Sequence, residues 1–96
     1  HANDQDWLAM EMQDLYSMLD VVLSKIDANT LLIVTADHEC GYISIKGKNA
    51  PRVVFGSKVH SSQMVPVFAS GPGAEEFAGI YENTEIFEKM KILLGL

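Results

Sequence analysis

Four side chains in this sequence have the chemistry of metal ligands and lie near the ends of predicted elements: His1, Asp37, His38 and His60. They include every histidine of the chain. Imidazole nitrogens and carboxylate oxygens are typical zinc ligands, and one ion takes three or four of them. Asp37 and His38 are adjacent, so both could bind one ion only if the backbone turns between them. The sequence has no helical HExxH motif and no CxxC pair.

By spacing alone, this set also fits a simpler interpretation. Asp37 and Glu39 could be turn residues at a solvated junction, with His38 on the surface, and the three histidines could be unrelated. Glu39 could be a metal ligand, a hydrogen-bond partner that orients a ligand, or a solvated carboxylate. We favour the last two for Glu39.

The segment before Asp37 predicts a strand that ends at this group. Residues 31–35 are apolar or β-branched, which is typical of a strand buried on both faces of an α/β sheet. In open sheets of this kind, ligands bind beyond the carboxyl ends of strands. His1 stands where a helix is predicted to begin, with Asn3 or Asp4 as its cap.

The other predicted elements follow from apolar periodicity. An amphipathic helix is expected over roughly residues 4–28, with an apolar stripe of Leu8, Met12, Leu15, Leu19, Val22, Leu23 and Ile26. Residues 42–45 and 52–56 predict a hairpin, and residues 57–63, which include His60, predict a loop. A second strand is expected over residues 65–70. The last helix begins at Asn83 or Thr84, and Gly95 is a plausible C-cap.

The predicted fold class is α/β, in the order helix, strand, hairpin, strand, helix. Two buried strands cannot form a well-covered parallel sheet alone. We therefore expect residues 1–96 to be an incomplete domain, completed by a larger parent sheet or by contacts with other copies. The abrupt start at His1, without a leader, suggests a cut within a longer protein.

Composition limits the classes of function. The chain is 48% hydrophobic and 21% charged, an ordinary globular balance. A formal net charge of −6 argues against binding nucleic acid, and it would repel a phosphorylated substrate unless bound cations reverse the local sign. Cys40 is the single cysteine, so no internal disulfide can form. No apolar run reaches membrane-spanning length.

Four segments, in order along the chain, resemble the alkaline phosphatases, which are zinc-dependent phosphomonoesterases. Thr35–Glu39 reads TADHE, a signature of that family. The other segments match a helix start after a metal-binding loop, the strand and turn after the last metal histidine, and the entry into the last helix. These are His1–Asp4, then Val65–Ala69 with Gly71–Ala74, and Glu82–Ile86.

The resemblance implies a role for each candidate ligand. Asp37 and His38 would bind the zinc that activates a serine nucleophile, and His1 and His60 would bind the second zinc, which activates water. The family's nucleophilic serine, phosphate-binding arginine, magnesium ligands and remaining zinc ligands would lie upstream of His1. No catalytic residue is therefore assigned within the chain. Export to the periplasm or the extracellular space is also implied by the resemblance alone.

Two positions depart from the family pattern. Cys40-Gly41-Tyr42 stands where Thr-Gly-Gly is usual, and Ser61 follows the last histidine where threonine is common. Neither change removes a ligand. Cys40 could be a soft competing ligand, but a small buried residue is the favoured interpretation.

The expected function is therefore that of the C-terminal, ligand-bearing part of an alkaline phosphatase with a phosphoserine intermediate. We expect the fragment alone to be inactive. One alternative is a non-catalytic module for folding or self-association, such as a homodimer. Another is a related two-metal hydrolase of phosphodiesters or sulfate esters, although residues 71–86 favour the alkaline phosphatases.

Overall fold

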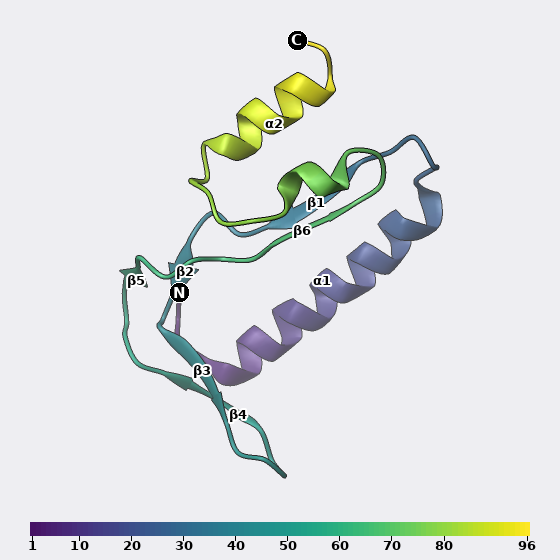
Figure 1. Ribbon diagram of the computed structural model, residues 1–96. Helices are drawn as coiled ribbons and strands as arrows, with labels where there is room; N and C mark the ends of the chain where they lie inside the picture. Colours follow the sequence, from purple (N-terminus) through teal and green to yellow (C-terminus); the bar gives the residue numbers. More distant parts are fainter. The chain divides into compact units, whose positions relative to one another are not determined.

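The computed structural model describes all residues, 1–96 (Figure 1). The chain divides into two compact units. The first unit contains residues 1–25 and 38–64, and the second contains residues 26–37 and 65–96. The fold is mixed α and β, with helices at both ends of the chain and three two-stranded antiparallel sheets. Neither helix is both long and apolar enough to cross a membrane.

Helix α1, Gln5–Lys25, opens the first unit. Asp4 is its cap, because its Oδ1 accepts hydrogen bonds from the backbone N–H groups of Asp6 and Trp7, at 2.9 Å each. The predicted apolar stripe is largely the half-buried face of the helix, with Leu8, Leu15, Leu19 and Val22 partly covered. The helix is shorter at both ends than the predicted span.

The predicted hairpin is present in the first unit as β3, Ile43–Lys46, and β4, Arg52–Phe55. Ile43 pairs with Phe55, and Lys46 pairs with Arg52. The side chain of Gln5 accepts a hydrogen bond from the N–H of Val53 at 3.2 Å. This bond joins the first turn of α1 to β4 and so fixes the hairpin beside the helix start.

A second, shorter ladder follows the TADHE segment. It pairs β2, Glu39–Cys40, with β5, His60–Ser61, in an antiparallel register. Glu39 lies opposite Ser61, and Cys40 lies opposite His60. The prediction of a loop throughout residues 57–63 is therefore wrong at His60 and Ser61, because these residues pair with a partner about 20 positions away that no local pattern reveals.

The second unit is built on β1, Leu32–Thr35, and β6, Val67–Ser70. The two strands pair with each other in antiparallel fashion, with Leu32 opposite Ser70 and Thr35 opposite Val67. Pro66 directly precedes β6, where its missing N–H removes no ladder bond. The expectation that residues 31–35 are buried on both faces is wrong, since a two-stranded ladder leaves this segment only half-buried.

The helices of the second unit pack beside this ladder. The 3₁₀ helix η1, Ala74–Phe77, contacts β6 and α2, Glu85–Leu93. Phe77 is 4% exposed and is the buried apolar side chain of this unit. Gly95, predicted as a C-cap, adopts a φ of +72°, and Leu96 N–H donates to the carbonyl of Lys91 at 3.0 Å. This is the Schellman geometry that ends a helix with glycine.

Candidate metal centre

His1 is positioned by the short arm that precedes α1. Asn3 has a φ of +54°, a left-handed conformation that asparagine tolerates better than most residues. Its side-chain amide donates a hydrogen bond to the carbonyl of Ser57, three residues before His60. The arm is therefore held against the segment that leads into β5, and this contact brings His1 towards His60.

Gly41 allows the chain to turn directly after β2. Its φ is +88°, and a Cβ at this position would lie 2.9 Å from both Asn3 Oδ1 and a ring carbon of Phe55. Its N–H donates to the carbonyl of Val59 at 3.3 Å, and its carbonyl accepts from the N–H of Gly56 at 3.0 Å. Glycine is thus required for the close packing that joins β2, β4 and the start of β5.

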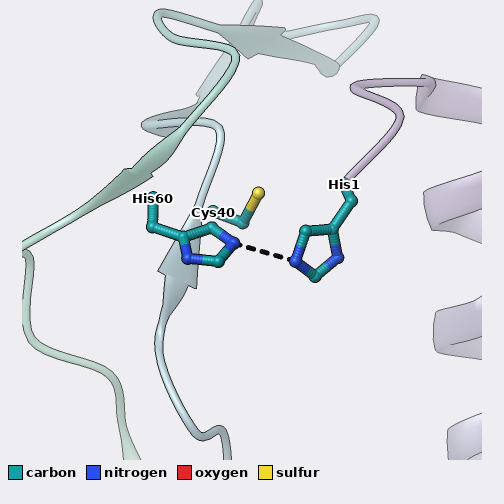
Figure 2. A group of neighbouring side chains, drawn as sticks. All are labelled: His1, Cys40 and His60. Atoms are coloured by element: carbon teal, nitrogen blue, oxygen red, sulfur yellow. Dashed lines mark hydrogen bonds between the residues drawn. The ribbon is translucent and has the colours of Figure 1, made fainter.

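The imidazole rings of His1 and His60 are in direct contact (Figure 2). Their Nε2 atoms are 2.8 Å apart, and the ring centroids are 4.9 Å apart at an interplanar angle of 69°. One Nε2 must donate a proton and the other must accept it. A zinc ion holds two imidazole nitrogens about 3.3 Å apart in tetrahedral geometry, so a small rotation of two exposed side chains would make this pair fit a zinc ion.

His38 joins the same group from the position directly before β2. Its ring stacks on that of His60, with centroids 3.8 Å apart and an interplanar angle of 29°, and its centroid is 5.7 Å from that of His1. Its Nδ1 is 3.1 Å from the carbonyl oxygen of Glu39, which can only accept, so Nδ1 is the donor. In the neutral ring, Nε2 then carries the lone pair. Metal-binding histidines commonly have this arrangement.

Glu39 is held by its neighbours within the first unit. Its carboxylate accepts hydrogen bonds from the hydroxyl of Ser61 and, at 3.2 Å, from the N–H of Ile43. The hydrogen bond from Ser61 is the main cause of the lowered pKa of Glu39. Partial desolvation acts in the opposite direction and raises the pKa, whereas hydrogen bonds from backbone N–H groups lower it further. The carboxylate thus supports the β2–β5 ladder next to the histidines, a position consistent with a supporting residue.

Asp37, the remaining predicted ligand, belongs to the second unit. It follows β1 by two residues and is exposed. The strand end therefore presents this carboxylate where it was predicted. The three histidines, which come from three segments of the chain, gather within the first unit.

Cys40 is less buried than its residue type predicts. It was expected to be a small buried residue, but it is only half-buried and its thiol is free. Its Sγ and one nitrogen each of His1 and His60 all lie within 4.8 Å of one another. The pairing of Cys40 with His60 across β2 and β5 causes this, and only the register reveals it.

An open hollow of about 410 Å³ adjoins the His1–His60 pair. It is lined by His1, Lys58, Val59 and His60. The hollow is open to solvent beside the imidazoles, and Lys58 contributes a positive charge in a chain of net negative charge.

Comparison with known families supplies the lineage. Residues 43–96 match the family model described as Alkaline phosphatase. Because this match covers more than half of the chain, the chain belongs to the alkaline phosphatase family. Comparisons with curated proteins and with solved structures found no match. His1 and His38 lie outside the matched residues, so their meeting with His60 is a separate observation.

Proposed function

We propose that this chain supplies zinc ligands to a phosphate monoester hydrolase of the alkaline phosphatase type. The observation that supports this is the meeting of His1, His38 and His60 in one unit of a chain that belongs to this family. Zinc, when bound, would supply Lewis-acid stabilisation of the phosphoryl oxygens. The donor types fit zinc, since neutral imidazoles and a carboxylate are ligands that it accepts.

The proposal divides the ligands into two pairs. His1 and His60 would hold one ion, as the 2.8 Å separation of their nitrogens suggests. His38 and its neighbour Asp37 would hold the other. The stacked rings of His38 and His60 would keep the two imidazoles in fixed relative orientation. The chain has a net charge of −6, which would repel an anionic substrate. Two zinc ions would reverse the sign of the charge locally, at the site itself.

The remaining parts of the active site would come from a longer parent domain of which residues 1–96 form the C-terminal part. The proposal follows the family resemblance here: a serine outside the chain would form the phosphoserine intermediate, and magnesium would bind ligands outside the chain. Two features support incompleteness: the sheets have two strands each, and Phe77 is the single apolar residue more than nine-tenths buried. We propose that the parent has the family's three-layer fold and acts outside the cytoplasm, in the periplasm or extracellular space.

Zinc binding by the 96-residue chain tests the ligand assignment. The chain would be stripped with chelator and titrated with zinc, alongside His60→Ala, His38→Ala and the control Glu11→Gln, which removes an exposed carboxylate of α1. We expect uptake of about one zinc per chain or more. Each histidine variant should bind less zinc, and the control should bind as much zinc as the unsubstituted chain. Equal uptake by all four proteins would overturn the assignment.

Phosphatase activity tests the need for a parent domain. The chain alone is expected to release no phosphate from a phosphate monoester, because no serine here has the family's context. Turnover that rises in proportion to the concentration of the pure chain would contradict this.

A second candidate function, self-association, is favoured by exposed apolar side chains. On α1, Trp7 is 65% exposed, Met10 63% and Tyr16 60%. Such surface commonly marks an interaction face. We therefore propose that the chain forms homodimers or larger assemblies when its parent sheet is missing. Sedimentation at several concentrations tests this, and a monomer throughout would count against it.

A further inference from the structure

The β2–β5 ladder places a thiol beside the two imidazoles. Cys40 and His60 are direct cross-strand partners, and such pairs project to the same face of a ladder. Figure 2 shows the Cys40 side chain next to the two rings, and the three ligand atoms lie within 4.8 Å of one another. Backbone pairing, rather than a flexible loop, therefore sets the position of the sulfur.

We propose that the thiolate of Cys40 is a third ligand of the ion that His1 and His60 hold. The inference rests on the proposed pairing of those two histidines. Binding would replace the thiol proton with a sulfur–metal bond and release that proton, so charge and atoms balance. The resulting donor set, two imidazoles and one thiolate, leaves a fourth tetrahedral position open, as in catalytic zinc sites.

The spacing fits this donor set. Bond lengths of about 2.0 Å to nitrogen and 2.3 Å to sulfur place a sulfur and a nitrogen about 3.5 Å apart around a tetrahedral ion. The observed limit of 4.8 Å requires the sulfur and a nitrogen to approach by about 1.3 Å at most. His1 and His60 are exposed and Cys40 is half-buried, so side-chain rotation can supply this movement without a change in the ladder.

A thiolate ligand has two consequences for this chain. First, three of the ligands for one ion would come from within residues 1–60. Second, sulfur favours zinc and other soft or borderline ions over magnesium and calcium, which prefer oxygen. The site should therefore retain zinc in excess magnesium.

Cobalt spectroscopy tests the sulfur–metal bond directly. The reduced chain would be titrated with Co²⁺, which gives a thiolate-to-metal absorption band only when sulfur is a ligand. We expect this band in the unsubstituted chain and its loss in Cys40→Ser. Zinc affinity of Cys40→Ser should fall by at least about 10-fold, since even the loss of a supporting group beyond the ligands costs 10–100-fold. Ser62→Ala is the matched control and should retain both properties.

A second measurement requires no substitution at Cys40. Because this is the single cysteine, alkylation of the chain reports on its thiol alone. Zinc should slow alkylation by iodoacetamide in the unsubstituted chain and in Ser62→Ala, and should have no such effect in His60→Ala. Magnesium should give no protection.

The outcomes separate this inference from the proposed function. Metal binding without the thiolate band, and without protection from alkylation, would overturn the role of Cys40. If His60→Ala still abolished zinc uptake in that case, the histidine pairing would stand. Absence of zinc binding in the unsubstituted 96-residue chain would overturn both the role of Cys40 and the histidine pairing.

Discussion

Ser61 donates a hydrogen bond from its hydroxyl to the carboxylate of Glu39, its direct partner across the β2–β5 ladder. The next pair in the same register is Cys40 with His60. One contact thus stabilises the ladder that brings a thiol and an imidazole together. Because a two-residue ladder has few backbone bonds, this side-chain bond is a substantial part of what holds the register.

The bond from Ser61 predicts an acid-dependent stability of the first unit. The folded pKa of Glu39 is lowered, so the contribution is fully present above the ordinary glutamate pKa, about 4.3, and is lost as pH falls through the lowered pKa. Ser61→Ala should raise the pKa of Glu39 and flatten this acid dependence. NMR titration of the Glu39 carboxyl and unfolding at several pH values would measure both effects. The control is Ser62→Ala, whose acid dependence should be that of the unsubstituted chain. Identical acid dependence of Ser61→Ala and Ser62→Ala would contradict the prediction.

The side chain of Asn3 is predicted to increase zinc affinity because it holds His1 in position. Asn3→Gly preserves the left-handed φ of +54° but removes the hydrogen bond to the carbonyl of Ser57. A net loss of about 0.5–1.5 kcal/mol for one such bond corresponds to a two- to tenfold weaker zinc Kd. Isothermal titration would measure the change. Asn49→Gly, in the exposed turn between β3 and β4, is the matched control. The prediction fails if both variants bind zinc equally well.

Much of the secondary structure could be predicted from apolar periodicity. The half-buried face of α1, the β3–β4 hairpin, the strand after Pro66 and the glycine at the end of α2 all follow from local signals. The pairing of β1 with β6 could not be predicted in this way, because partners across a ladder are set by contacts far apart in sequence. The apolar pattern therefore predicts the two strands but not their antiparallel pairing.

The candidate site shows the same limit at the level of single residues. Residue chemistry was enough to select the three histidines, but not to show that their rings meet. Cys40 was expected to be buried because free cysteines commonly are. Its place opposite His60 depends on two-residue strands that are too short to have a periodicity.

Gly41 is predicted to be essential for the geometry of the metal centre. Gly41→Ala should destabilise the first unit by about 1–2 kcal/mol from the left-handed backbone alone. Crowding adds to this, because the new Cβ would lie 2.9 Å from Asn3 Oδ1 and from the ring of Phe55. Zinc affinity should fall as β2 shifts. Thermal unfolding and zinc titration would measure the two effects.

Gly79→Ala is the control for Gly41→Ala. Gly79 also has a positive φ, +115°, but nothing lies within 4 Å of its Cβ position. It belongs to the second unit, so its substitution should strain the backbone and leave zinc affinity unchanged. If Gly41→Ala and Gly79→Ala were to have equal effects on zinc binding, crowding next to Cys40 would not be the cause.

Phe77 is predicted to stabilise the second unit without contributing to the metal site of His1, Cys40 and His60, which lies in the first unit. It is 4% exposed, and its carbonyl accepts a hydrogen bond from the hydroxyl of Tyr81 at 3.0 Å. Phe77→Ala should cost about 3 kcal/mol or more, the usual effect of emptying a buried aromatic site. Hydrogen exchange should then accelerate at the amides of β1 and β6, while the cobalt spectrum of the first unit stays unchanged. Phe87→Ala, at a side chain 60% exposed, should leave exchange nearly as it was. Loss of the cobalt spectrum in Phe77→Ala would contradict the prediction.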